Sequence, residues 1–173
     1  MTKLTVKPAR VYLPGFTLVE IIIVVMIIAI AAAIVGPMMS SAGSVQVRAA
    51  ANMIAADLEY AKSMAITMQQ NHRVVFDAAN ETYQIQDSSG TVIDHPVEVG
   101  SDYSVDFGND GRLDRVDIVS ADFDGNEEVE FDYLGRPYDS GGNSLNSGVI
   151  RLAADGVTMT VNVGPVTGYI SIN

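Results

Sequence analysis

The sequence contains no cysteine and no tryptophan, and only two of its 173 residues are histidine. Without cysteine the chain cannot form disulfides, present a thiolate nucleophile, ligate zinc through sulfur or carry a lipoprotein anchor. His72 and His95 have no Ser or second His at a useful spacing, so we expect each at the surface or at a helix end. No glycine-rich phosphate loop, zinc motif or nucleophile elbow is present. These absences predict that the protein is not an enzyme and holds no resident cofactor.

Basic residues are also scarce, since ten Lys and Arg face 21 Asp and Glu, for a net charge of −11. Three of the bases (Lys3, Lys7, Arg10) lie in residues 1–15, which contain no acid, so residues 16–173 alone carry −14. A domain of this charge is repelled by nucleic-acid phosphates and anionic lipid headgroups, and we expect no nucleic-acid partner. The acidity serves solubility in the simplest interpretation, and attraction for Ca²⁺ or for a basic protein is the alternative.

Two acidic segments, 106–114 and 122–128, place carboxylates and amides around turns that contain glycine. Ca²⁺ takes oxygen ligands of this kind. Neither segment fits the EF-hand pattern, because the first lacks an acid at its third position and the second has Glu127 where glycine is required. The candidate ligands for Ca²⁺ are Asp122, Asp124 and Asn126, and solvated acidic turns are the alternative.

One long apolar run is present, and residues 21–39 within it carry no charged side chain. As a helix, residues 16–39 would measure about 36 Å, compared with about 30 Å for the hydrocarbon core of a bilayer. A secretory signal would end in a small-x-small site and a polar mature start, whereas Ala31–Ala33 leads into further apolar sequence. The run therefore predicts a membrane-spanning helix, with the basic residues 1–15 in the cytoplasm and the remainder of the chain beyond the membrane.

Two residues are unusual in a plain membrane anchor. A carboxylate such as Glu20 costs about 2.5–3.5 kcal/mol at the centre of a membrane helix, and less near an end where it can snorkel. An acid inside such a helix is by default a functional-site hypothesis. Pro37 removes a backbone donor and crowds the carbonyl of Ala33, which predicts a kink near residues 33–37. The alternative is that the helix stops at Gly36.

The run Gly15-Phe16-Thr17-Leu18-Val19-Glu20, followed by an apolar helix, resembles the type IV prepilin signature. The resemblance implies that a prepilin peptidase removes residues 1–15 by cutting between Gly15 and Phe16, and methylates the new amine of Phe16. Glu20 becomes the fifth residue of the mature chain, and the new amine supplies its missing partner, either one helical turn away or on a neighbouring subunit. A proline at the place of Pro37 is also familiar in pilins and pseudopilins.

The sequence predicts that the stem helix continues as an amphipathic helix over residues 40–71. It predicts a β-rich domain over residues 72–173. The apolar positions of the helix recur at steps of three and four, at Ala50, Met53, Ile54, Leu58, Ala61, Ala65 and Met68. We expect this stripe to pack on the domain's own sheet. From residue 72 the period changes to two, and short strands are expected around Val74, Tyr83, Val97–Val99, Tyr103–Phe107, Val116, Val129, Val149–Leu152, Val157–Val163 and Ile170. The expected fold is α+β, with one long N-terminal helix packed on antiparallel sheet.

Three later segments narrow the resemblance. Residues 58–66, residues 131–137, and the final hairpin of residues 161–163 and 167–170 resemble runs in H-type minor pseudopilins of type II secretion and in FimT-type minor pilins. Some FimT-type proteins take up DNA through a basic C-terminal tail, whereas residues 168–173 contain no Lys or Arg. This departure favours the secretion pseudopilin.

The resemblance as a whole implies a minor pseudopilin near the tip of a periplasmic filament that drives protein export. It implies a single-pass precursor in the bacterial inner membrane, with a periplasmic C-terminal domain that later joins the pseudopilus. Its implied partners are the lipid bilayer before assembly, the prepilin peptidase, an inner-membrane assembly platform and other pilin-like subunits in a hetero-oligomeric filament. One alternative is a minor pilin that primes a type IV pilus. A second, from another class, is a membrane-anchored periplasmic binding module that never assembles.

Overall fold

The computed structural model describes residues 15–39 and 42–173, which belong to two compact units that meet between Met39 and residue 40. The first unit contains one helix, α1 (Leu18–Met39). This helix continues through Pro37 instead of stopping at Gly36. The kink predicted near Pro37 and the continuity of the stem stay predictions, because residues 40–41 lie outside the described residues.

In the part of the chain that the structure describes, no helix has both the length and the apolar character needed to cross a membrane. The span predicted over residues 16–39 is not confirmed by this finding.

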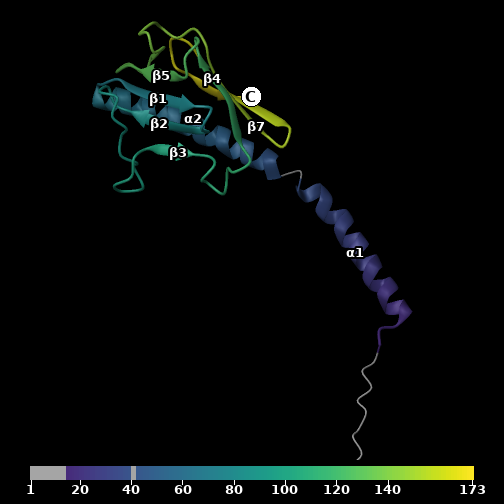
Figure 1. Ribbon diagram of the computed structural model, residues 1–173. Helices are drawn as coiled ribbons and strands as arrows, with labels where there is room; N and C mark the ends of the chain where they lie inside the picture. The colour runs from purple at the N-terminus through teal and green to yellow at the C-terminus, as the bar shows by residue number, and fades with distance from the viewer. Residues whose placement is uncertain (1–14, 40–41) are drawn as a thin grey trace, which may run out of the picture. The chain divides into compact units, whose positions relative to one another are not determined.

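The second unit begins with helix α2 (Ala42–Met68), which packs against both sheets of the domain (Figure 1). The predicted apolar stripe is buried at five positions, Ala50, Ile54, Leu58, Ala61 and Ala65. Met53 is partly buried against the same core. Met68 departs from the prediction, because 55% of it is exposed where α2 runs out past the sheets.

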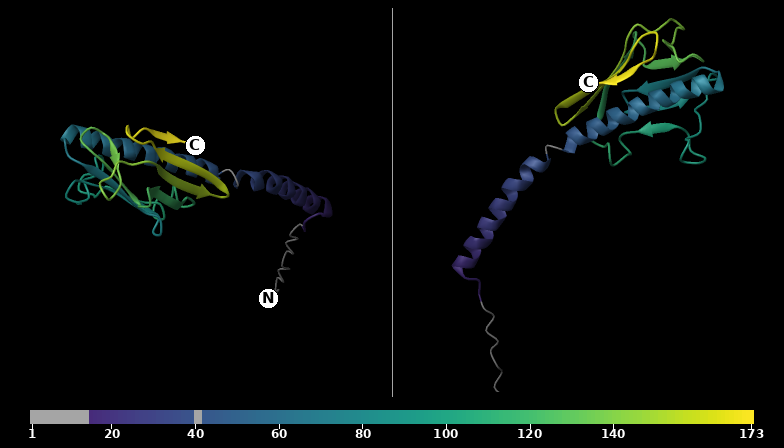
Figure 2. Two further views of the ribbon diagram at one scale, coloured as in Figure 1. Left: turned by 90° about the horizontal axis from the view of Figure 1, so that it is seen from above. Right: turned by 180° about the vertical axis from the view of Figure 1, so that it is seen from behind.

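In the described part of the chain nine strands form two antiparallel sheets. The sequence predicted antiparallel sheet but not its division into two. The first sheet has the order β3 (Ser104–Asp106), β2 (Thr82–Gln86), β1 (His72–Asp77), β5 (Glu128–Phe131) and β6 (Pro137–Tyr138). The second has the order β4 (Asp117–Phe123), β7 (Gly148–Ala154), β8 (Val157–Val163) and β9 (Ile170–Ile172). The α+β fold class is confirmed. Figure 2 shows the last strands, drawn in yellow, beside α2.

The core lies between α2 and the inner faces of the two sheets. Alternation along β1 buries every second side chain, as a strand with one covered face requires. Phe76 of β1 and Phe123 of β4 stack with their ring centroids 5.8 Å apart, so that an aromatic contact joins the two sheets.

One strand prediction is wrong. Val97 and Val99 lie in the long connection between β2 and β3, and 81% and 98% of these residues are exposed. The connection is held by isolated bridges, Gln86 with Val92 and Asp94 with Asp102, and the valines stand beyond the second bridge. The alternation of Val97, Glu98 and Val99 therefore belongs to a loop tip that has no buried side. Separately, strand β6 was not predicted, because two residues are too few to show a strand pattern.

Candidate processing and assembly site

The predicted cleavage junction lies directly before α1. Gly15, Phe16 and Thr17 are not helical, and 79% of Phe16 is exposed. The side chain of Thr17 caps the helix, because its Oγ1 accepts a hydrogen bond of 3.2 Å from the backbone N–H of Glu20. The Thr17 carbonyl starts the helical ladder by accepting from Ile21 N–H at 3.2 Å. The described side of the junction is therefore exposed and not helical, and a capped helix follows it.

Glu20 stands in the first turn of α1, three residues after the cap. A Thr and a Glu at this spacing are typical of a capping box, and an acid in the first turn interacts favourably with the helix dipole. Capping alone could therefore account for a carboxylate at this position. The apolar sequence that follows sets Glu20 apart, since it is the one acid among residues 15–39.

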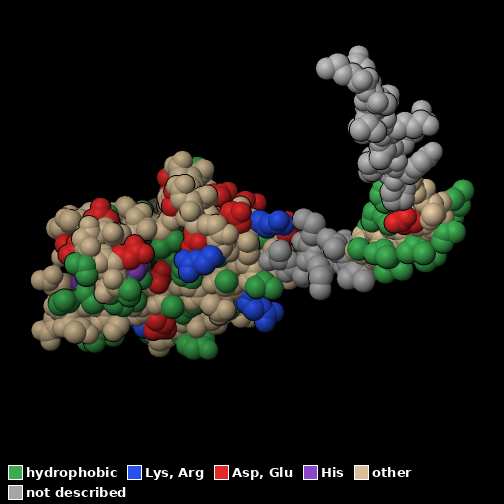
Figure 3. All heavy atoms as spheres, turned by 90° about the horizontal axis from the view of Figure 1, so that it is seen from below, with side chains coloured by type: hydrophobic (Ala, Val, Ile, Leu, Met, Phe, Trp, Pro, Cys, Tyr) green, Lys and Arg blue, Asp and Glu red, His purple; other side chains and the backbone are tan. Residues whose placement is uncertain are grey.

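Helix α1 is apolar on all sides. The large side chains from Ile21 to Ile30 are between 45% and 61% exposed, and no side chain described in residues 15–33 is buried. Figure 3 shows hydrophobic side chains over the described part of this helix. A helix that is apolar all round requires an apolar environment, which is lipid or other protein helices.

The three later segments of the resemblance meet at the end of α2. The Lys62 ammonium donates a hydrogen bond of 3.0 Å to the Gly168 carbonyl. A Cβ on Gly168 would lie 2.9 Å from the Gly135 carbonyl, and a Cβ on Gly135 would lie 3.0 Å from Cδ1 of Ile66. Both glycines have positive φ, +59° and +78°. Both positions are thus favoured for glycine by conformation, and Gly168 is required in addition by its close approach to the Gly135 backbone.

The turn between β5 and β6 is organised by Asp132. Its Oδ1 accepts from the backbone N–H groups of Leu134 and Arg136 at 2.9 and 2.8 Å, and its Oδ2 pairs with the Arg136 guanidinium at 2.7 Å. Partial burial of Asp132 opposes ionisation, but the hydrogen bonds from Arg136 and Leu134 outweigh it and lower the pKa of the carboxyl. This turn is therefore built on a charged side chain that is itself almost buried.

Sequence reasoning missed one buried acid, Asp57 in the middle of α2. It accepts hydrogen bonds from the hydroxyls of Tyr83 and Tyr103 and is 9% exposed. Burial raises the pKa of Asp57, and the two tyrosine hydroxyls offset this only in part. The steps of four and three from Ala50 through Ile54 to Asp57 were the available signal, since they place Asp57 on the buried stripe.

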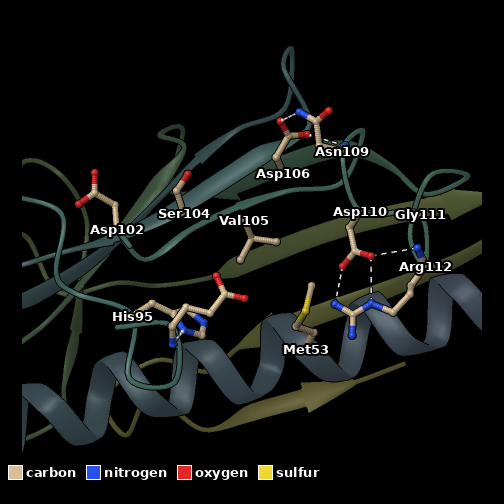
Figure 4. A pocket seen from close by; sticks show the side chains of 11 residues that line it. Met53, His95, Asp102, Ser104, Val105, Asp106, Asn109, Asp110, Gly111 and Arg112 are labelled. Carbon is tan, nitrogen blue, oxygen red and sulfur yellow. Dashed lines mark hydrogen bonds and ion pairs between the residues drawn. The ribbon is translucent and has the colours of Figure 1, made fainter. Parts of the chain in front are cut away.

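A hollow of about 390 Å³ lies between α2 and the loops around β3 (Figure 4). Met53 projects toward it from α2, and two of its four acids are engaged in local contacts. Asp110 binds the Arg112 guanidinium at 2.6 Å, and Asp106 accepts from Asn109. The hollow belongs to the first predicted acidic segment, whose carboxylates here stabilise turns.

The predicted Ca²⁺ candidates lie at the end of β4, which includes Asp122, and in the turn that follows it, which includes Asp124 and Asn126. Asp122 Oδ1 accepts from Gly125 N–H at 2.7 Å, and Asp124 Oδ2 accepts from Asn146 N–H at 2.7 Å. Asn126 pairs with Phe123 through the backbone. Within residues 15–39 and 42–173, no group of three or more acidic or histidine side chains is placed to hold a metal ion. Ca²⁺ binding stays a prediction without a preformed cluster behind it.

The histidines differ from expectation in one case. His72 is the first residue of β1, 4% exposed, with Nδ1 3.1 Å from the Gln70 carbonyl. It follows the helix end as predicted, but it is buried and not at the surface. The ring of His95 contacts that of Tyr103 at a tilt of 41°, with the centroids 4.7 Å apart, and its Nδ1 accepts from the N–H groups of Val97 and Glu98.

Comparison with protein families shows what the junction is. The family described as the prokaryotic N-terminal methylation motif matches residues 14–36, a range that includes Gly15, Phe16 and Glu20. Residues 14–36 therefore carry the methylation motif that the resemblance to type IV prepilins predicted.

Two solved structures are similar to the chain, both of the type IV minor pilin FimU of Pseudomonas aeruginosa (strain PAO1). They share 14% sequence identity over 73% of this chain, and they are covered over 91% and 87% of their own length with TM-scores of 0.45 and 0.48. A likeness of this size says nothing about function. The comparison with curated protein sequences finds no match.

Proposed function

We propose that this chain is a structural subunit of a type IV pilin-like filament, and specifically a minor pseudopilin of a type II secretion system. The observation that carries the proposal is the matched methylation motif at residues 14–36, with its exposed junction before a capped apolar helix. The proposed role is mechanical, and no step of chemistry is assigned to the globular domain.

Cleavage between Gly15 and Phe16 would leave a positive amine next to the helix cap. Thr17 separates this amine from the first turn of α1, and Glu20 lies in that turn. In a water-poor filament core the amine and the carboxylate offset part of each other's desolvation cost. Pairing between the amine of one subunit and Glu20 of its neighbour would set the axial register of assembly.

The apolar surface of α1 supplies the driving force for packing. The side chains described in residues 15–33 are exposed within their own unit. In the proposed precursor, the lipid of the inner membrane surrounds them. Extraction from lipid is favourable only if the same surface is buried again among neighbouring helices. A filament meets this requirement, whereas a membrane-anchored periplasmic binding module would keep the helix in lipid and would never need the extraction.

Two features support the secretion filament over a DNA-handling pilin. Residues 16–173 carry a net charge of −14, and residues 168–173 contain no base. Both disfavour contact with nucleic acid. The proposed partners are the prepilin peptidase, the inner-membrane assembly platform and other pilin-like subunits.

Mass spectrometry of the protein extracted from membranes of a host with the peptidase tests the proposal. We expect a mature chain that begins with N-methylated Phe16. An intact leader in that host would remove the filament function altogether.

Variants of Glu20 test the assembly step. Glu20→Ala should be cleaved normally and fail to enter filaments, whereas Glu20→Asp, which keeps the charge, should retain part of the assembly. A Glu20→Ala chain that is processed and assembles normally would contradict the proposed pairing. A deletion strain then distinguishes a type II secretion system from a type IV pilus. Lost exoprotein secretion supports the pseudopilin, and lost twitching or piliation supports a type IV pilus subunit.

A further inference from the structure

An apolar patch covers the end of the domain where α2 terminates. Its members come from three separate segments, namely the end of α2, the β5–β6 turn and the β8–β9 turn. Each is 47–69% exposed, and together they are Ile66, Met68, Tyr133, Leu134, Val166 and Tyr169. We call these six residues the turn patch. The backbones that carry them are in direct contact through Gly135 and Gly168.

The β8–β9 turn presents Val166 in a strained conformation. Val166 has a φ of +65°, and the N–H of Thr167 donates to the Pro165 carbonyl at 2.7 Å across it. This is the positive-φ form of the γ-turn, which is rare and unfavourable for a β-branched residue. The fold keeps an exposed valine where glycine or asparagine would relieve the strain. Strain retained at an exposed position suggests a role for the side chain that packing within the domain does not provide.

The turns that hold the patch are rigidly tied. Gly164 N–H donates to the Tyr169 carbonyl at 2.8 Å, and Lys62 holds the Gly168 carbonyl. Asp132 fixes the other turn through two backbone N–H groups and Arg136. Apolar side chains on such a frame lose little conformational freedom when a partner covers them.

The charges around the patch identify the kind of partner. Beside the patch Lys62 pairs with Glu59 at 2.7 Å, and Arg136 pairs with Asp132 at 2.7 Å. The patch is therefore neutral by formal charge, on a chain that carries −14 from residue 16 onward. A neutral surface is the part of this acidic domain that a neighbouring domain meets with the least charge repulsion. A basic protein would instead be drawn to the acidic loops.

The size of the patch argues that contact here depends on a second attachment. Six large side chains with about this exposure present roughly 600 Å². A stable interface uses about 800 Å² from each partner, so the patch alone is too small for a lasting complex. Subunits whose helices already pack together would meet at a high effective concentration, at which a weak contact suffices.

We propose that the turn patch docks on the globular domain of the adjacent filament subunit, a contact that rests on the proposed function. The apolar helix α1 and the turn patch are then two separate surfaces by which one subunit holds its neighbours. The tips of the patch, Val166 and Tyr169, make the contact, and the glycines beneath them fix its shape.

Site-directed cross-linking of the full-length protein in cells tests this contact. The chain contains no cysteine, so Val166→Cys or Tyr169→Cys carries a thiol-reactive photocross-linker at a single place. Val97→Cys and Val99→Cys are matched controls, because these valines are 81% and 98% exposed but lie in an acidic loop away from the patch. Each variant is compared in the wild-type and Glu20→Ala backgrounds.

We expect adducts from residues 166 and 169 several-fold above those from residues 97 and 99. The cross-linked partner, identified by mass spectrometry, should itself carry a methylated N-terminus of the same motif, and the adduct should disappear in Glu20→Ala. Equal yields at patch and control positions in assembled filaments would overturn the inference while the proposed function stands. So would an adduct that persists in Glu20→Ala with a protein lacking the motif. An unprocessed leader would overturn both.

A second variant separates docking from folding. Val166→Asn suits the positive φ better than valine does, so its melting temperature should equal or exceed that of the wild type. On the Tyr169→Cys background it should reduce the adduct several-fold. Retention of the full adduct yield by Val166→Asn would contradict a docking role for the Val166 side chain.

Discussion

The hydroxyl of Tyr103 donates a hydrogen bond of 2.8 Å to Oδ1 of Asp57, in the middle of α2. The hydroxyl of Tyr83 donates to the other oxygen of the same carboxylate at 2.5 Å. Tyr83 belongs to β2, and Tyr103 directly precedes β3. One buried carboxylate therefore ties the helix to β2 and to the segment that leads into β3.

Replacing Asp57 should destabilise the domain. Asp57→Ala leaves two buried tyrosine hydroxyls without this acceptor, at a cost of about 3 kcal/mol in the free energy of unfolding. Urea unfolding of the full chain in detergent, followed by circular dichroism, measures the effect. The control is Asn52→Ala, an exposed change on the same helix, which should stay within about 0.5 kcal/mol of the wild type. Equal losses from the two variants would show that the tyrosine hydroxyls find other partners.

The raised pKa of Asp57 predicts a pH dependence of known sign. Because the folded state holds this proton more tightly than the unfolded state does, the contribution of Asp57 to stability declines as pH rises. The decline begins near pH 4, the ordinary Asp pKa, and ends above the raised pKa of the folded state. The free energy of unfolding of the wild type should therefore fall relative to that of Asp57→Asn over this window. At higher pH the difference between the two proteins should stay constant. A relative gain over the same window would contradict the assignment.

Asp132 should behave in the opposite way. Its pKa is lowered, so the stability that it contributes is present above the ordinary value of 3.8 and is lost as pH falls through the folded-state pKa. Asp132→Asn should cost about 1–2 kcal/mol near neutral pH, since it weakens the charged contacts with Arg136. Thermal melts at neutral and acid pH should show a difference from the wild type that shrinks below pH 3.8. A difference that does not change with pH would mean that the charge of Asp132 adds nothing to stability and that only neutral hydrogen bonds contribute.

Gly148 at the start of β7 should not tolerate a methyl group. A Cβ there would lie 2.7 and 2.9 Å from ring carbons of Phe123, which is fully buried and has no room to move. Gly148→Ala should cost about 1–3 kcal/mol, although alanine is the better residue in a strand interior. Gly111→Ala is the matched control, because nothing lies within 4 Å of its Cβ position. Similar melting temperatures for the two variants would show that the β4–β7 pair can shift without cost.

Local patterns predicted the elements well where one face is buried. The stripe on α2 and the strands around Val74, Tyr83 and Val161 were visible because burial alternates with the helical or strand period. The same pattern failed at Val97 and Val99, where alternating valines form a loop tip with no covered side. It also failed at Met68, where the helical period runs one turn beyond the sheets that the helix covers.

The processing junction was predictable because its signal is contiguous. Gly15 and Phe16 are neighbours in the chain, and both the cap at Thr17 and the acid at Glu20 lie within about one helical turn of them. No tertiary contact is needed to bring these groups together. The motif match at residues 14–36 includes all four residues, and cleavage and methylation at the junction stay predictions.

By itself, the sequence determined the pilin-like start of the chain, the acidic character of the domain and the succession of a helix and short strands. Only the tertiary structure decided that the strands divide into two sheets, that Asp57 lies between two tyrosines, and that residues 66, 134 and 166 share one exposed surface. The reason is physical. Helix caps and periodic burial depend on neighbours a few residues apart, whereas a buried acid or a docking surface is made by residues far apart in the chain, whose meeting depends on how the whole core packs.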